Sequence, residues 1–288
     1  IELFTEDDQY QTAKTVTAYN KLVNLNGVKV IFVITYGGVI AVSSQAQRDN
    51  VIVIDTLDCD EELAALPRNI ICIAKKSEDL GSKNAISAIK RNHTPAAILY
   101  AEGDLFYTKV AKAAKYTFEK NKERVVLYQG LASPIYDFKA ILLKAKNKKA
   151  KSLFIFGYDD WGLAMKQARE LKIDLPIYSV PTIHSPGFKA SAKGSEEGTY
   201  VAGWFAPKTE AFFKFLKEFK TKEGREPFLE VSTVPTFDIA KILVEGMKKS
   251  VDSVGEVNTD ILREYLYTIK NYQGLAGITT IDPDGAVR

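Results

Sequence analysis

The polar, aromatic and small residues that could bind a ligand in this chain lie directly after strand-like runs of sequence. Five such segments stand out: residues 35–38, 55–58, 101–107, 157–161 and 180–184. Open α/β sheets bind ligands beyond the carboxyl ends of their strands, so these segments predict a cleft for a small molecule. Tyrosines there offer apolar area with a polar tip, and small residues let backbone amides approach a ligand. Any single one of these residues could equally be an ordinary loop residue.

The side chains that usually perform catalysis or bind metals are scarce. The two histidines, His93 and His184, each stand alone, and no group of Cys and His has the spacing of a zinc site. The pair Gly37-Gly38 is the nearest feature to a phosphate cradle, but the further glycines and the Lys-Ser/Thr of a nucleotide loop are missing. The pattern therefore predicts a binding protein with no catalytic residue, no metal and no cofactor.

Adjacent carboxylates occur at Glu61-Glu62 and at Asp159-Asp160, each after a strand-like run and before a helical one. Paired carboxylates could perform acid–base work. Acidic residues are also favoured at helix N-termini, because the helix dipole stabilises negative charge there. We favour the helix N-terminus as the interpretation of both pairs.

Two cysteines, Cys59 and Cys72, lie thirteen positions apart. They could be two reduced, buried thiols or one disulfide. A disulfide that closes so short a loop would stabilise the fold by roughly 3 kcal/mol on the chain-entropy model. Neither the number of cysteines nor their spacing decides between the two alternatives.

The composition is that of an ordinary globular protein, with 46% hydrophobic and 26% charged residues among 288. This length suffices for two packed domains. The 39 basic and 36 acidic residues give a net charge of +3, so the overall balance predicts no nucleic-acid partner and no strong attraction to an anionic membrane. The longest apolar runs, such as residues 30–34, are too short to span a bilayer and predict buried strands instead.

Strand-like and helix-like runs alternate along most of the chain. Short β-branched and aromatic runs predict strands at residues 29–34, 51–54, 96–100, 124–128, 152–156, 176–179 and 199–204, and a strand-like run opens the chain at 1–4. Apolar stripes at helical spacing fill the gaps, and long helices are predicted at 209–222, 232–249 and 259–270. The end of the chain is hairpin-like, with a turn signal at 282–285. The pattern predicts an α/β fold whose parallel sheets carry helices on both faces.

Several segments are similar, in order and spacing, to landmarks of a known family. They are Glu6-Asp7-Asp8-Gln9, Lys21-Leu22-Val23-Asn24, the run 30–34, Gly157-Tyr158, the helical run 165–171, Pro176-Ile177, residues 194–198 and Phe237-Asp238-Ile239-Ala240. Over the whole chain they resemble the type I periplasmic binding proteins of branched-chain amino acid (Leu/Ile/Val) ABC transporters.

The resemblance implies two Rossmann-like lobes with parallel sheets, joined by three crossing strands, with the ligand in the cleft between the lobes. The first lobe would comprise residues 1–74 and 205–281, and the second would comprise 75–204 and 282–288. The third crossing would fall near 278–282. The family normally has a further strand and helix ahead of the first segment seen here, and a short tail beyond residue 288.

The resemblance also assigns ligand contacts. The α-carboxylate of an amino acid would bind near Tyr36, Gly37 and Gly38 and near the run from Thr56 through Leu57 and Asp58 to Cys59, although the last three residues depart from the small or hydroxyl residues usual there. Phe106 or Tyr107, together with Tyr158, would close over the ligand from the second lobe.

The family's acidic partner for the ligand ammonium would follow the strand that ends at Ser179. The segment 180–184, which includes Thr182, has no carboxylate. We therefore expect that Asp58 or Asp159 takes this role, or that the ligand is not a standard zwitterion.

In function, the resemblance implies a non-enzymatic receptor that captures a small solute, such as an amino acid or a related carboxylate, by hinge closure and delivers it to a membrane permease. The protein would lie in the periplasm or outside the cell, with a lipid anchor as one option, and this location favours the disulfide between Cys59 and Cys72. The alternative is the ligand-sensing domain of a signalling receptor with the same fold. An enzyme is disfavoured by the missing catalytic motifs.

Overall fold

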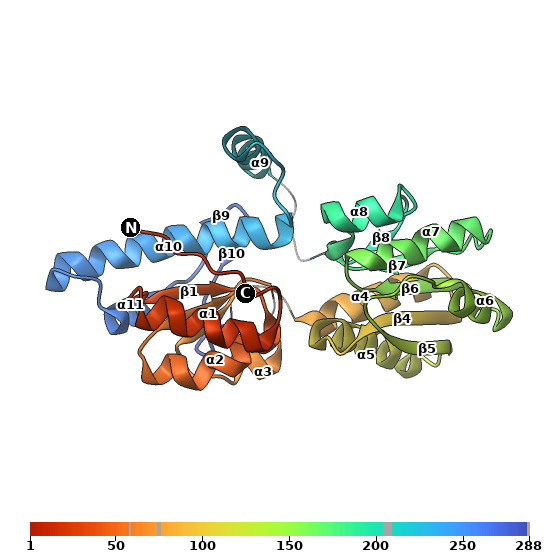
Figure 1. Cartoon of the computed structure of the whole chain (residues 1–288), viewed down its shortest axis with the longest axis horizontal. Coiled ribbons are helices and arrows are strands. Elements are labelled where there is room, and N and C mark those ends of the chain that lie inside the picture. Colours follow the sequence, from red (N-terminus) through yellow and green to blue (C-terminus); the bar gives the residue numbers. More distant parts are fainter. Residues whose placement is uncertain (58, 74–75, 204–208, 287–288) are drawn as a thin grey trace. The chain divides into compact units, whose positions relative to one another are not determined.

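The computed structural model describes residues 1–57, 59–73, 76–203 and 209–286. The chain divides into two compact units (Figure 1). Unit 1 comprises Ile1–Lys76 and Phe205–Arg288, and unit 2 comprises Ser77–Trp204. Each unit is an α/β layer structure around its own parallel sheet, as the alternation of strand-like and helix-like runs predicted.

Unit 1 contains a three-stranded parallel sheet in the order β1-β2-β3. Its strands are β1 (Val30–Val33), β2 (Ile52–Asp55) and β3 (Ile70–Cys72). The last residues of the three strands are in register, with Val33 opposite Asp55 and Asp55 opposite Cys72. The segments that follow β1 and β2 therefore begin side by side at the carboxyl end of the strands, which is where a ligand site was predicted.

Helices cover both faces of the unit 1 sheet and bury alternate residues of each strand. They are α1 (Thr12–Asn24), α2 (Tyr36–Arg48), α3 (Glu61–Ala64), α10 (Glu230–Val254) and α11 (Thr259–Tyr267). Helix α9 (Glu210–Glu223) also belongs to unit 1, but none of its residues is in the core clusters of this sheet. In β2, Val53 packs into the cluster that includes residues of α1 and α2, whereas Ile52 and Ile54 pack into a second cluster with residues of α10 and α11. This division follows from the two-residue period of a strand.

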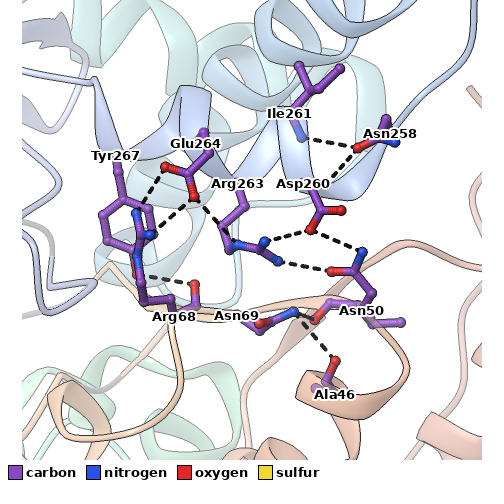
Figure 2. A network of polar contacts seen from close by, with 11 residues as sticks. Ala46, Asn50, Arg68, Asn69, Asn258, Asp260, Ile261, Arg263, Glu264 and Tyr267 are labelled. Atoms are coloured by element: carbon purple, nitrogen blue, oxygen red, sulfur yellow. Dashed lines mark hydrogen bonds and ion pairs between the residues drawn. The ribbon is translucent and has the colours of Figure 1, made fainter. Parts of the chain in front are cut away.

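A polar network ties α11 to loops that lie about two hundred residues earlier in the chain (Figure 2). Arg263 donates to the Asn50 side chain at 2.9 Å and to Asp260 at 2.6 Å. Arg68 pairs with Glu264 at 3.1 Å and stacks over the ring of Tyr267, 4.4 Å from its centroid. These contacts join the end of the chain to the sheet of unit 1.

Unit 2 contains a five-stranded parallel sheet in the order β5-β4-β6-β7-β8. The strands are β4 (Ala96–Glu102), β5 (Val125–Ala132), β6 (Ser152–Phe156), β7 (Ile177–Ser179) and β8 (Tyr200–Val201). All five residues of β6, the central strand, are buried, as is typical of a strand covered on both faces.

The helices of unit 2 alternate with its strands and enclose one continuous core. They are α4 (Ser77–Lys90), α5 (Leu105–Lys120), α6 (Lys139–Asn147), the short η1 (Asp159–Trp161), α7 (Gly162–Glu170), η2 (Pro181–His184) and α8 (Pro186–Ala192). Helices α4 and α5 pack closely because Gly81 has no side chain: a Cβ there would lie 2.1 Å from the Val110 carbonyl oxygen.

Two expectations about the two ends of the chain need correction. The strand-like run 1–4 pairs with no strand among the described residues, and Ile1 and Leu3 are exposed. The terminal hairpin is formed by β9 (Tyr272–Gly274) and β10 (Gly277–Thr279), ahead of the predicted turn at 282–285. That turn does form, closed by a hydrogen bond from Gly285 N–H to the Asp282 carbonyl.

The last residues of the chain lie in unit 1 and not in the second lobe, where the sequence placed 282–288. The reason is a backbone connection to β3, in which Cys72 N–H donates to the Gly285 carbonyl and Cys72 bridges Ala286. The chain thus passes between the units near residues 76 and 204, and no third crossing near 278–282 is present in the described part of the chain.

Candidate functional site

The first turn of α2, at the carboxyl end of β1, is arranged to bind an anion. The helix begins at Tyr36, and the N–H groups of Gly37 and Gly38 have no hydrogen-bond acceptor among the described residues. The N-cap residue Thr35 does not cap the helix with its side chain. Open N–H groups and the positive end of the helix dipole make such a helix start suited to a carboxylate or phosphate.

The two glycines also have a packing role, which the sequence did not reveal. A Cβ on Gly37 would lie 2.5 Å from Thr12 Oγ1, and a Cβ on Gly38 would lie 2.4 Å from Thr15 Oγ1. Helix α1 therefore approaches the start of α2 so closely that a Cβ at either glycine would require the side chain of Thr12 or Thr15 to move. Because glycine has no side chain, neither residue shields its own backbone N–H group.

Asp8 lies beside this helix start and was not among the predicted site residues. Its Oδ2 accepts hydrogen bonds from Thr35 Oγ1 at 2.6 Å and from Thr15 Oγ1 at 2.7 Å. Partial burial opposes ionisation, but the hydrogen bonds from Thr35, Thr15 and the Tyr10 N–H outweigh it and lower the pKa of Asp8. The helix start thus carries a carboxylate that is ionised at neutral pH.

The segment after β2 is buried and joined to the end of β1. Thr56 N–H donates to the Val33 carbonyl at 3.1 Å, and Leu57 N–H donates to Asp55 Oδ1 at 2.9 Å. The side chains of Thr56 and Leu57 are 3% and 6% exposed, so both residues act through packing at this position. Asp58 lies outside the described residues.

Cys59 and Cys72 form a disulfide in the structure, with their Cα atoms 5.1 Å apart. The bond links the segment after β2 to the last residue of β3. Tyr36 belongs to the same neighbourhood of unit 1, and its hydroxyl donates to Glu62 Oε2 at 2.8 Å. At the carboxyl end of the unit 1 strands, a disulfide and side-chain hydrogen bonds therefore connect the segments that follow the strands.

A cluster of aromatic and hydroxyl groups occupies the corresponding edge of unit 2. Tyr158, which follows β6, donates to Asp104 Oδ2 at 2.6 Å, and its ring meets that of Tyr107 edge to face with centroids 5.1 Å apart. The Tyr107 ring makes a similar contact with Phe106, also at 5.1 Å. The residues come from the ends of β4 and β6, which are adjacent in the sheet.

Burial raises the pKa of Tyr158 well above its usual value, and the Asp104 carboxylate raises it further. Burial also raises the pKa of Tyr107. Both phenols therefore remain protonated at neutral pH, and the O–H of Tyr158 is already donated to Asp104. The structure thus brings the rings of Phe106, Tyr107 and Tyr158 into contact, and their role as ligand contacts stays a prediction. The Thr182 hydroxyl, in η2, is buried without a hydrogen-bond partner in the described part of the chain.

The acidic residues of this edge serve local structure. Asp104 caps α5 by accepting from Tyr107 N–H at 3.0 Å. Asp159 accepts a hydrogen bond from the Ser185 hydroxyl at the start of α8, and Asp160 accepts from Ile135 N–H at 3.0 Å. Asp159 and Asp160 lie at the start of η1, and Glu61 and Glu62 lie in the first turn of α3, so both acidic pairs occupy helix N-termini as predicted.

Asp8 lies outside the five segments that the sequence analysis predicted. Thr35 and Asp104 lie within the predicted segments 35–38 and 101–107 but were not singled out as site residues. A signal was available for Asp104, because an Asp two residues after a strand and before a helical stripe is typical of an N-cap. No comparable signal marked Asp8, whose role depends on Thr35, 27 residues away.

Two searches of the described residues define what the chain lacks there. No group of three or more His, Cys, Asp or Glu side chains in this part of the chain could hold a metal ion. None of its helices combines the length and the apolar character needed to cross a bilayer.

Comparison with known proteins identifies the family. A family profile described as "Periplasmic binding protein" matches residues 1–288, and the chain therefore belongs to the periplasmic binding protein family. Its fold is the type I fold of that family, with two α/β units and parallel sheets. No curated protein sequence is similar enough to match.

Solved structures of similar fold include LivJ from Streptococcus pneumoniae in complex with isoleucine, at 19% identity and a TM-score of 0.86, covering 100% of this chain and 81% of the other. The leucine-binding protein LivK from Thermotoga maritima shares 17% identity at a TM-score of 0.85 and covers 99% and 81%. A solute-binding protein from R. palustris in complex with benzoate shares 16% identity at a TM-score of 0.85 and covers 100% and 79%.

Proposed function

We propose that this protein is the solute-binding component of an ABC transporter and that its ligand is a zwitterionic amino acid. The observation that carries the proposal is the start of α2, where the N–H groups of Gly37 and Gly38 are open and Asp8 is held beside Thr35. Open helix N–H groups bind the ligand's carboxylate. Asp8 is the anion that pairs with its ammonium.

The position of Asp8 discriminates between the two ligand classes seen in proteins of similar fold. Isoleucine carries both charges, whereas benzoate carries the negative charge alone. An ionised Asp8 next to the carboxylate site repels a simple anion and attracts a group that is also cationic. Asp8 therefore replaces Asp58 and Asp159 as our candidate for the ammonium partner, and Asp159 already holds Ser185.

The aromatic cluster of unit 2 supports a role in covering the solute. Tyr158 is partly exposed at the carboxyl end of the unit 2 sheet and offers apolar ring area there, while the rings of Tyr107 and Phe106 are buried and pack behind it. In the proposed cycle, the two units close on the solute by a hinge motion at the chain segments that join them, and the closed form delivers it to a membrane permease. Neither step requires catalysis.

Calorimetric titration of the whole chain tests the ligand class. We expect branched-chain amino acids to bind, while the matching 2-oxo acid, which has no amine, and the amide, which has no carboxylate, bind at least about tenfold more weakly. Asp8→Asn should weaken binding of the amino acid by a similar factor and leave the affinity for the 2-oxo acid unchanged. Binding of benzoate or the 2-oxo acid in preference to every amino acid would sink the proposal.

A further inference from the structure

The charges of the chain are segregated between the two units, although the whole chain is close to balanced. Residues 77–204, which form unit 2, contain 20 Lys and Arg against 13 Asp and Glu, a net charge of +7. The remaining residues contain 19 basic and 23 acidic side chains, a net charge of −4. The net charge of +3 therefore conceals a strongly basic unit.

Within unit 2 the excess lies at the amino end of the sheet, in the four turns that lead into β4, β5, β6 and β7. These turns, at residues 90–95, 119–124, 144–151 and 169–176, contain twelve basic and four acidic residues. Their backbones are joined: Lys151 N–H donates to the Pro95 carbonyl at 2.7 Å, and Ala96 N–H donates to the Arg124 carbonyl at 3.0 Å. We call the surface formed by the lysines of these four turns the basic edge, and every one of these lysines is exposed.

Compensation of helix dipoles does not account for this many cations. Cations in the last turn of a helix favour its dipole, and α6 has two there, Lys144 and Lys146. Three more lysines, Lys148, Lys149 and Lys151, follow directly in the turn that leads into β6. None of the five pairs with a carboxylate in the described part of the chain.

Backbone geometry gives an independent indication. Lys122, Lys149 and Lys172 follow α5, α6 and α7 with φ angles of 60°, 58° and 54°, in the left-handed region. Glycine or asparagine is favoured where a helix ends in this conformation, because a Cβ makes it unfavourable. In three turns of the basic edge, a lysine therefore occupies a left-handed backbone position at which glycine would be more stable.

Two of the three arginines of these turns, Arg91 and Arg169, make contacts within unit 2. Arg91 stacks over Tyr200, 4.7 Å from its centroid, and Arg169 binds the Ile173 carbonyl and the Asp174 carboxylate. The free charge of the basic edge is therefore carried mainly by lysine, a compact point charge without the fork geometry that recognises one phosphate or carboxylate. Such a surface suits a diffuse negative partner better than a single bound anion.

We infer that the basic edge of unit 2 binds the surface of a membrane that contains anionic phospholipids. Four neighbouring strands span about 15 Å at a spacing of about 4.8 Å, so their turns present a broad array of cations rather than a pocket. Each lysine close to an anionic lipid surface contributes to attraction that salt screens. This inference does not depend on the proposed amino-acid ligand, because it concerns the opposite end of the unit 2 sheet.

Sedimentation of the whole chain with phosphatidylcholine vesicles, with and without phosphatidylglycerol, tests the inference. We expect binding to the vesicles that contain phosphatidylglycerol, loss of that binding at high salt, and none to phosphatidylcholine alone. Replacing the five lysines at 144, 146, 148, 149 and 151 by glutamine should weaken binding at least about tenfold. Thermal denaturation of the variant verifies that it is folded.

The control variant replaces five exposed lysines of unit 1, Lys214, Lys217, Lys222, Lys241 and Lys248, by glutamine, so that the net charge changes equally. It should retain most of the binding. Equal loss in the two variants would show a response to net charge alone and would overturn the inference. Failure of the unmodified chain to bind the anionic vesicles at low salt, or tighter binding to a DNA duplex under the same conditions, would overturn it as well.

Discussion

Unit 2 encloses a five-stranded sheet in one continuous core, whereas unit 1 builds two separate clusters on the faces of a three-stranded sheet. Unit 1 adds links that unit 2 does not use to the same extent: the disulfide between Cys59 and Cys72 and the polar network around Arg263. Each of the two clusters of unit 1 is smaller than the single cluster of unit 2, so the disulfide and the polar network are expected to add to the stability that apolar burial gives unit 1. The two units should therefore respond to different substitutions.

The disulfide should have the largest effect, and it should act on unit 1. Replacing Cys59 and Cys72 by serine should lower the free energy of unfolding by roughly 3 kcal/mol, since the unfolded chain regains the freedom of the closed loop. Trp161 is fully buried in the core of unit 2, so its fluorescence reports on that unit. In denaturant, far-UV circular dichroism should show an early transition that tryptophan fluorescence does not follow.

Mass measurement with and without reductant accompanies this experiment. Two free thiols in protein that was never reduced would contradict the disulfide. A tryptophan transition displaced as far as the circular dichroism transition would show that the two units unfold together, and the comparison between them would then not hold.

The reverse experiment disrupts the core of unit 2. Gly81→Ala would put a Cβ 2.1 Å from the backbone oxygen of Val110, so α4 and α5 must separate. We expect a loss of about 2 kcal/mol, typical of overpacking, and a tryptophan transition at lower denaturant. Gly203→Ala is the matched control because nothing lies within 4 Å of a Cβ there. Equal stability of the two variants would refute the close crossing.

The polar network of unit 1 should have a smaller effect. Arg263→Ala removes hydrogen bonds to Asn50 and Asp260, and we expect a loss of about 1 kcal/mol because the pairs are partly exposed to solvent. The change should appear in circular dichroism before tryptophan fluorescence. Arg225→Ala, at an exposed position of the same unit, serves as the control and should leave stability unchanged.

The smallest effect concerns pH and Asp8. The pKa of this carboxyl is lower in the folded protein than its ordinary value of 3.8, so its contribution to stability is present above pH 3.8 and is lost as pH falls through the folded pKa. In Asp8→Asn this part of the acid dependence should be absent. Parallel pH profiles for the unmodified chain and the variant would show that Thr15 and Thr35 do not stabilise the ionised form.

Most strands were predictable because each is a short apolar run bounded by turn residues. Residues 152–156 were predicted and observed without change, and residues 96–100 form most of β4. β3 (Ile70–Cys72) was not predicted, since three residues give no periodicity to detect. The run 1–4 was strand-like in composition but lacks a pairing partner in the described chain, and strand formation depends on a partner more than on propensity.

The sequence indicated the aromatic residues and the glycines of the candidate site, but it did not indicate their packing contacts or hydrogen-bond partners. Gly37 and Gly38 turned out to carry the contact with α1 as well as open N–H groups, and Asp159 turned out to hold Ser185. Asp8 was overlooked because the hydroxyl groups that hold it come from two other segments of the chain. Such partnerships follow from strand order and helix packing, which no local window of sequence contains.

The sequence by itself determined the alternation of strands and helices, the parallel α/β architecture and the likeness to binding proteins, because these depend on neighbouring residues and their period. The tertiary structure decided which carboxylates are already hydrogen-bonded, where the last residues of the chain pack, and how a net charge of +3 divides into +7 and −4. The physical reason is that parallel strands bring the ends of distant segments to one edge of a sheet, and only their order fixes which side chains meet there.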